Sequence, residues 1–176
     1  MTRIRWAVAI VAIVIVGFGT VLVVALGNKT QPTSSLINEP APEFRTPDFD
    51  NQSIALSSYR GRVVLVNFWN EWCAPCIEET RDLVALATAR EADESFVMIG
   101  VVHDARSEKA ARKYAESEGM NYTLVFDPDA RIALDYRVEG QPESFIIDRS
   151  GIVRAFVAGP IDVLKISALI TELQRA

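Results

Sequence analysis

Apolar and polar residues follow two different patterns along this chain, one at its N-terminus and one in the rest. Trp6–Gly27 holds 22 consecutive residues without a charge and is dense in Val, Ile and Ala. Further along, residues 63–69 and 96–102 are almost unbroken apolar runs, which predict strands buried on both faces of a sheet. Each run precedes a stretch with apolar residues at helical spacing, at about 73–90 and 107–119, which predicts a helix after each strand.

The remainder of the chain predicts shorter elements and one closing helix. These are a hairpin at 54–56 and 59–62, a strand at 124–126, a hairpin at 144–147 and 152–157, and a last helix with the apolar stripe Ile166, Leu169, Ile170 and Leu173. Asp127 and Pro128 are expected to start a further helix, with Asp127 as its N-cap. This order of elements predicts the α/β fold class, with a central mixed β-sheet flanked by helices.

The N-terminal apolar segment is long enough to span a bilayer as a helix. Arg3 and Arg5 precede it and only Lys29 follows closely, so the positive-inside rule places the N-terminus in the cytoplasm. A cleaved signal peptide is the alternative, because residues 25–27 are compatible with a cleavage site, but the apolar stretch is longer than such peptides usually have. We therefore expect a cell-membrane protein with a single transmembrane helix and its main domain on the extracytoplasmic side.

Composition divides the chain into three parts. Residues 1–27 are the predicted cytoplasmic stub and transmembrane anchor, and residues 28–40 are polar with two prolines and are expected to form a flexible linker. Residues 41–176 would be the extracytoplasmic domain, which has a usual size for one globular unit. This part carries 15 Lys and Arg against 22 Asp and Glu, a net charge of −7 without a basic patch, which makes nucleic acid an unsuitable partner.

Both cysteines of the chain lie in one motif, Trp72-Cys73-Ala74-Pro75-Cys76, at the junction of the 63–69 strand and the following helix. Three residues apart on one helical turn, the two sulfurs can close a disulfide without unfolding the helix. Free backbone N–H groups at a helix start stabilise a thiolate, so Cys73 is the expected attacking sulfur and Cys76 the resolving one. Pro75 is expected to stiffen the first turn, and Trp72 to shield the pair and contact a partner chain.

Three other interpretations of the cysteines are weaker. A static structural disulfide that closes so short a loop would add little stability. A zinc site usually needs four ligands, whereas the chain offers two cysteines and one distant His103, which we expect at a surface or loop edge. Two unrelated buried cysteines would not be expected at a strand-to-helix junction beside Pro and Trp. The motif therefore predicts thiol–disulfide exchange by the cysteine pair, with no metal ion and no separate cofactor.

The motif and a second segment resemble a known family. Residues 68–76, Phe-Trp-Asn-Glu-Trp-Cys-Ala-Pro-Cys, look like the thioredoxin active site. Residues 138–148 are similar to the Gly-x-Pro-Glu-Thr-Phe signature of its membrane-anchored branch, and residues 41–44 resemble the lead-in of that branch. The branch includes the TlpA-like and ResA-like proteins and the CcmG/DsbE proteins of cytochrome c biogenesis. The resemblance covers about residues 41–176 and implies a thioredoxin-like fold with a redox-active disulfide.

The resemblance also implies roles for three residues outside the cysteine motif. Pro142 matches the family's cis-proline, which packs beside the disulfide and presents backbone to an extended substrate strand. Glu79, one helical turn after Cys76, and Glu143, directly after Pro142, match carboxylates that the branch keeps near its active site. A carboxylate there raises a cysteine pKa or serves as a base for Cys76. Each could instead be a solvated surface glutamate.

Two positions depart from the patterns of the relatives. Asn67 stands where thioredoxin carries a buried Asp that takes the proton of the resolving cysteine. Since Asn cannot titrate, another group or water must take that proton here. Thr80 stands where the family often has a proline that kinks the active-site helix.

The leading hypothesis is a membrane-tethered enzyme, a protein thiol–disulfide oxidoreductase that reduces extracytoplasmic disulfides. By resemblance, its client would be the Cys-x-x-Cys-His segment of apocytochrome c during cytochrome c maturation, and an integral-membrane electron donor of the CcdA/DsbD type would return it to the dithiol. An extracytoplasmic disulfide oxidase and a non-catalytic metal carrier on a thioredoxin scaffold are the alternatives. A thiol peroxidase fits less well, because Asn70 replaces the Thr of a peroxidatic Thr-x-x-Cys signature.

Overall fold

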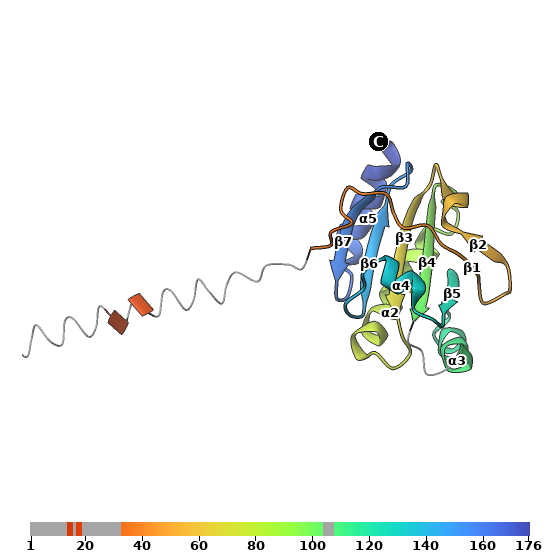
Figure 1. The fold of residues 1–176 in the computed structure, drawn as a ribbon, viewed down its shortest axis with the longest axis horizontal. Coiled ribbons are helices and arrows are strands. Elements are labelled where there is room, and N and C mark those ends of the chain that lie inside the picture. Colours follow the sequence, from red (N-terminus) through yellow and green to blue (C-terminus); the bar gives the residue numbers. More distant parts are fainter. Residues whose placement is uncertain (1–13, 16, 19–32, 104–107) are drawn as a thin grey trace, which may run out of the picture. The chain divides into compact units, whose positions relative to one another are not determined.

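A computed structural model describes residues 14–15, 17–18, 33–103 and 108–176 of the chain (Figure 1). From residue 33 on, it contains one five-stranded sheet, one small two-stranded sheet, four α-helices and one short 3₁₀-helix among the described residues. The predicted strands at 63–69 and 96–102 and the helices that follow them are present, which confirms the alternation inferred from the apolar runs.

The central sheet is mixed, as the order of elements predicts. Its strand order is β5 (Thr123–Asp127), β4 (Phe96–His103), β3 (Val63–Trp69), β6 (Glu143–Ile147) and β7 (Val153–Ala158). Strand β3 runs parallel to β4, and β4 runs parallel to β5, whereas β6 pairs antiparallel with both β3 and β7. Figure 1 shows β7 and β5 at opposite edges with β3 between them. The strand that leads into the cysteine motif is therefore central.

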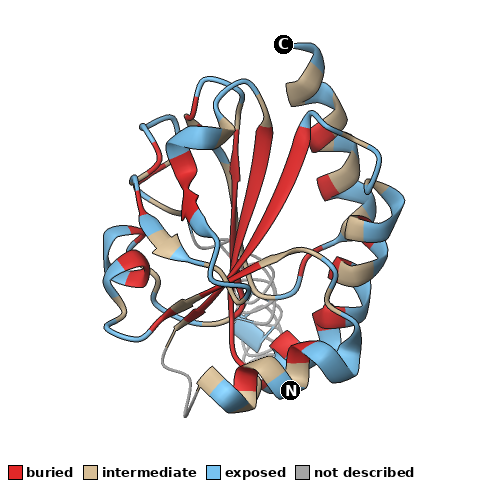
Figure 2. Cartoon of the chain, turned by 90° about the vertical axis from the view of Figure 1, so that its right-hand side faces the viewer, coloured by how far each residue is buried: buried red, intermediate tan, exposed pale blue. Residues whose placement is uncertain are grey.

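Every residue of β3 is buried, because both faces of the sheet are covered. Val64, Val66 and Phe68 face a layer made by helix α4 (Arg131–Asp135) and the segment that enters the domain. Val63 and Leu65 pack on the other face against α2 (Ala74–Ala89) and α5 (Val163–Arg175). Figure 2 shows how the strands concentrate the buried residues between these layers. Burial of each large apolar side chain contributes about 1.5–3 kcal/mol, so the strand beneath the motif is firmly anchored.

Helix α3 (Glu108–Glu118) covers the end of the sheet at which the cysteines lie. Ala111 and Ala115 pack in one cluster with Trp69 and both cysteines. The helix ends before Gly119, whose φ of +65° lies in the left-handed region that glycine adopts without strain. Residue 107, at which the sequence pattern predicts this helix to begin, lies outside the described residues.

The hairpin predicted from residues 54–56 and 59–62 is wrong. Strand β2 (Ser53–Ala55) pairs instead with the preceding β1 (Arg45–Pro47), and Leu56–Tyr59 form the 3₁₀-helix η1. The Glu43 carboxylate accepts hydrogen bonds from the Ser57 N–H and hydroxyl, at 3.0 and 2.8 Å. Such side-chain bonds offer the backbone an alternative to a strand ladder.

Two helix starts differ from the sequence-based expectation. Helix α2 begins at Ala74, and Cys73 is its N-cap rather than its first helical residue. Asp127 does not cap α4, because it is the last residue of β5 and Ala130, at φ 52°, precedes the helix. The Asp127 carboxylate still accepts a hydrogen bond from the Ala133 N–H at 3.0 Å, so it stabilises the helix from the neighbouring strand.

The predicted membrane segment lies almost entirely outside the described residues. Within the described part of the chain, no helix combines the length and apolar composition needed to cross a membrane. Of the predicted linker, residues 33–40 are described and pack on the domain. Leu36 belongs to the core, the Asn38 N–H donates to the Val153 carbonyl at 2.8 Å, and Pro40 forms a bridge with Ile152. The compact unit therefore starts before residue 41.

Gly100 offers a test of the packing that holds Trp69 beneath the cysteines. A Cβ at Gly100 would lie 2.7 Å from Leu124 Cδ2 and 2.9 Å from Trp69 Nε1, closer than such atoms approach in folded proteins. We expect Gly100→Ala to lower the free energy of unfolding by about 1–3 kcal/mol, as overpacking does. Urea unfolding of the oxidised protein measures the change. Gly140→Ala is the control, since nothing lies within 4 Å of its Cβ, and equal losses in both variants would contradict the packing argument.

Candidate active site

The two cysteines form a disulfide at the junction of β3 and α2. Cys73 and Cys76 have an S–S distance of 2.07 Å and a Cα–Cα distance of 5.2 Å. Cys73 precedes the helix as its N-cap with an extended backbone, and Pro75 lies in the first turn. A proline costs little there because its missing N–H would have no partner within the helix.

Backbone N–H groups of the first helical turn converge on Cys73. The Cys76 N–H donates to Cys73 Sγ at 3.2 Å, and the Ile77 N–H donates to the Cys73 carbonyl oxygen at 3.0 Å. The sulfur therefore occupies the position that a Ser, Thr or Asp oxygen takes at an ordinary N-cap. After reduction, a thiolate at this place gains a charge-assisted hydrogen bond and the favourable end of the helix dipole.

The two cysteines differ in access to solvent. Cys73 is 7% exposed, whereas Cys76 is 1% exposed and lies against the core. A cleft of about 480 Å³ opens beside Cys73 and is lined by Trp72–Pro75, His103 and Val138–Gln141. Trp72 is 44% exposed at its margin. An incoming chain can therefore meet one sulfur, and the Trp72 ring is exposed beside it; its contact with a partner chain stays a prediction.

The segment opposite the cysteines contains Pro142. The peptide bond between Gln141 and Pro142 is cis, as the resemblance implies. Glu143 follows it as the first residue of β6, and its carboxylate accepts a hydrogen bond from the Gly140 N–H at 3.2 Å. Burial raises the pKa of Glu143 above its ordinary value. Glu143 thus binds the backbone of the 138–141 segment, which lines one side of the cleft.

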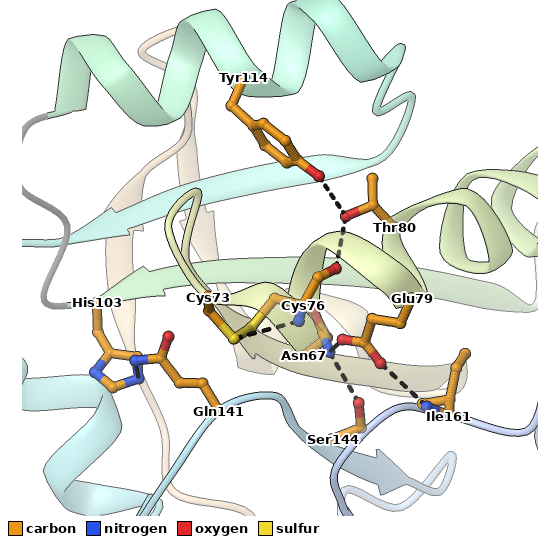
Figure 3. The surroundings of a disulfide bond; sticks show 10 residues. All are labelled: Asn67, Cys73, Cys76, Glu79, Thr80, His103, Tyr114, Gln141, Ser144 and Ile161. Atoms are coloured by element: carbon orange, nitrogen blue, oxygen red, sulfur yellow. Dashed lines mark hydrogen bonds between the residues drawn. A yellow bond between two sulfur atoms is a disulfide. The ribbon is translucent and has the colours of Figure 1, made fainter.

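Glu79 is not a surface residue. It is 1% exposed, and its carboxylate accepts hydrogen bonds from Asn67 Nδ2 at 2.9 Å and from the Ile161 N–H at 3.1 Å (Figure 3). Desolvation by burial raises the pKa of Glu79 to about 7, although both hydrogen bonds act in the opposite direction. This carboxyl group, one turn after Cys76 on the buried side of α2, can therefore hold or release a proton near neutral pH.

The structure does not bring Glu79 and Glu143 together. Asn67 pairs with Ser144 across the β3–β6 ladder, and Phe68 pairs with Glu143. Because successive side chains of a strand alternate between faces, Glu143 lies on the face of Phe68, opposite the face on which Asn67 contacts Glu79. Asn67 Nδ2 also donates to the Ser144 hydroxyl at 3.0 Å. Asn67 is buried at the position where thioredoxin carries an Asp. Its side chain orients the Glu79 carboxylate.

Two residues of the cleft, His103 and Gln141, are not among the site residues that the sequence predicts. His103 lies at the end of β4 with its ring edge-on to Phe68, the ring centroids 5.9 Å apart, and its Nε2 lies 2.7 Å from Gln141 Nε2. The sequence predicts that His103 lies far from the cysteines, whereas in the structure it lines the same cleft as Cys73. A signal was available, since the carboxyl ends of parallel strands β3 and β4 meet at one edge of the sheet.

Comparisons with known proteins agree with this geometry. The model of the AhpC/TSA family matches residues 37–156, more than half of the chain. The thiol:disulfide interchange protein DsbE of Allochromatium vinosum is 38% identical over 133 residues, covering 73% of this chain and 70% of that protein. This chain belongs to the AhpC/TSA family. Within the family it is a thiol–disulfide oxidoreductase of the DsbE and ResA type.

Two further relatives support the same placement. The thiol-disulfide oxidoreductase ResA of Geobacillus kaustophilus is 30% identical over 130 residues, covering 74% of this chain and 74% of that protein. The crystal structure of a protein assigned as DsbE from Chlorobium tepidum superposes with a TM-score of 0.71 at 26% identity, covering 82% of this chain and 99% of that chain. The AhpC/TSA domain described here thus has the thioredoxin-like fold, with a mixed sheet flanked by helices.

The raised pKa of Glu79 predicts how stability depends on pH. Between pH about 4.5 and 7 the folded state holds the Glu79 proton more tightly than the unfolded chain. The contribution of Glu79 to the free energy of unfolding is complete below pH 4.5 and is lost as the pH rises to 7. We expect a decline of about 3 kcal/mol in the free energy of unfolding over this range. In Glu79→Gln this part of the pH dependence should disappear, because Gln does not titrate.

Chemical unfolding of the oxidised full-length protein at a series of pH values measures this difference. A Gln side chain can accept only one of the two hydrogen bonds that Glu79 accepts. The free energy of unfolding of the variant should therefore also be lower at acidic pH, by about 1 kcal/mol. Glu143 titrates in both proteins, so its effect cancels when the free energy of unfolding of the variant is subtracted from that of the wild type. Parallel curves for wild type and Glu79→Gln from pH 4 to 8 would show that Glu79 ionises as an ordinary glutamate.

Proposed function

We propose that this thiol–disulfide oxidoreductase is tethered to the cell membrane by its N-terminal helix and reduces protein disulfides on the extracytoplasmic side. The observation that carries the proposal is the unequal placement of the two sulfurs. Cys73 meets a cleft at the start of α2, whereas Cys76 is enclosed behind it. Such a pair suits attack by one sulfur and resolution by the other.

The reaction runs in two exchanges at Cys73. In the first, the Cys73 thiolate attacks one sulfur of a client disulfide, which forms a mixed disulfide and releases the other client sulfur as a thiolate. In the second, the Cys76 thiolate attacks Cys73 Sγ, which closes the Cys73–Cys76 disulfide and releases the remaining client thiolate. The client gains two electrons and the enzyme loses two, so a dithiol donor must reduce the enzyme before the next cycle.

Glu79 is the group that we assign to the proton of Cys76. Its pKa of about 7 leaves part of the population ionised near neutral pH, so it can accept a proton as Cys76 becomes a thiolate. Asn67 and the Ile161 N–H hold the carboxylate in place without competing for that proton. Asn67 cannot take the proton itself, which leaves Glu79 as the titrating group of the buried cluster formed by Asn67, Glu79 and Ser144.

The names of the relatives support a proposal for the clients and the electron donor. The similar proteins are named DsbE and ResA, and the sequence resemblance associates that branch with cytochrome c biogenesis. We therefore propose the Cys-x-x-Cys-His segment of apocytochrome c as client, and an integral-membrane donor of the CcdA/DsbD type as the source of electrons. The segment that leads to cis-Pro142 and the Trp72 ring would place an extended client segment across the cleft.

Trapping the reaction intermediate tests the proposal. In Cys76→Ser the first exchange can occur but the second cannot, so mixed disulfides with clients should accumulate on Cys73 in the membrane fraction. Non-reducing electrophoresis followed by mass spectrometry identifies them. Cys73→Ser is the matched control and should trap none.

Three outcomes would oppose parts of the proposal. Absence of any adduct in Cys76→Ser cells would count against exchange with clients. A strongly oxidising reduction potential of the Cys73–Cys76 pair would reverse the direction and favour the oxidase. Tight metal binding without dithiol turnover would favour the carrier.

A further inference from the structure

A chain of hydrogen bonds connects helix α3 to the first turn of α2. The Tyr114 hydroxyl donates to Thr80 Oγ1 at 3.1 Å, and the Thr80 hydroxyl donates to the Cys76 carbonyl oxygen at 2.8 Å (Figure 3). Thr80 is 2% exposed, and the Tyr114 ring packs on Trp69 with the centroids 5.7 Å apart. The bond from Thr80 to Cys76 is therefore buried, where it competes little with solvent, and the bond from Tyr114 is partly buried.

The hydrogen-bond chain continues through one peptide unit to the attacking cysteine. The Cys76 carbonyl belongs to the same peptide unit as the Ile77 N–H, which donates to the Cys73 carbonyl oxygen at 3.0 Å. A hydrogen bond accepted by a peptide carbonyl polarises the N–H of that unit and strengthens the bond it donates. The two hydroxyls thus reinforce the bond that closes the first turn of α2.

The donor end of this chain keeps its proton. Burial raises the pKa of the Tyr114 hydroxyl above its ordinary value. The Cys76 carbonyl fixes the direction of the chain because it can only accept, so the Thr80 hydroxyl donates to it and the Tyr114 hydroxyl donates to Thr80 Oγ1. Thr80 Oγ1 takes part in both hydrogen bonds, so loss of its hydroxyl would disconnect Tyr114 from Cys76.

We propose that Thr80 and Tyr114 are positioning residues that hold the first turn of α2 in place while the disulfide is open. In the oxidised enzyme the Cys73–Cys76 bond itself closes the turn. In the mixed disulfide that bond is absent, and the hydroxyl chain keeps the turn formed so that Cys76 Sγ stays in line with Cys73 Sγ. The inference rests on the proposed function, since it assigns the hydroxyls to the second exchange.

Rapid mixing of the reduced full-length protein with glutathione disulfide tests this assignment. Acid quenching and mass spectrometry follow the mixed disulfide on Cys73 and its conversion to the Cys73–Cys76 disulfide. We expect Tyr114→Phe and Thr80→Val to slow the second step about 3- to 10-fold, as loss of one buried hydrogen bond predicts. Tyr114→Phe keeps the ring on Trp69, and Thr80→Ser, which keeps the hydroxyl, should restore the wild-type rate.

Two comparisons separate this role from a general effect on the helix. The double variant Thr80→Val/Tyr114→Phe should be no slower than Thr80→Val alone, because Tyr114 acts through Thr80. Thr88→Val is the matched control, since the Thr88 hydroxyl donates to the Val84 carbonyl at 2.8 Å and accepts from Asn121 Nδ2 at 3.0 Å on the same helix. This control should close its disulfide at the wild-type rate.

The outcomes distinguish this inference from the proposed function. If the wild type forms no mixed disulfide and no Cys73–Cys76 disulfide, the proposed function fails. If the wild type closes normally and Thr80→Val and Tyr114→Phe close equally fast, only the hydroxyl chain is wrong. Equal slowing in Thr88→Val, or a double variant slowed by the product of the two single effects, would also overturn it.

Discussion

The contact of the Cys73 sulfur with the N–H groups at the start of α2 is the interaction on which the site depends. Cys73 is an N-cap whose capping atom is a sulfur, and the Cys76 N–H donates to it. A helix terminus leaves N–H groups that need an acceptor, and a thiolate is a better acceptor than a thiol. The fold therefore favours the charged, attacking form of this cysteine without a cationic side chain at the motif.

The rest of the domain places other groups around that sulfur. The fully buried β3 fixes where α2 begins, and the end of β4 brings His103 to the same cleft. The antiparallel β6 starts next to the cis-Pro142 and supplies Glu143 to hold the opposite wall. Glu79 lies on the buried side of α2, where desolvation moves its proton affinity into the neutral range. Each of these groups therefore comes from a different helix or strand, and the central sheet fixes their relative positions.

Much of this architecture could be predicted because its signals are local. The runs at 63–69 and 96–102 predict buried strands by composition alone, and two cysteines three residues apart at a strand-to-helix junction indicate a closable pair. The hairpin predicted within 54–62 was wrong because β2 pairs with β1, a strand that lies outside the segment. His103 was expected to be distant from the cysteines because its neighbours become evident only when the parallel pairing of β3 and β4 is considered. Hydroxyl contacts such as that of Thr80 with Tyr114 depend on helix packing that no short motif encodes.

The most direct test of this account is the pH dependence of alkylation at Cys73 in the reduced full-length protein. Iodoacetamide reacts with the thiolate, and mass spectrometry assigns the adduct to Cys73 or Cys76. We expect Cys73 to react first, with a midpoint clearly below the ordinary thiol pKa of about 8.5, because the helix N–H groups stabilise its thiolate. An ordinary midpoint, together with a rate no faster than that of free cysteine, would contradict the account.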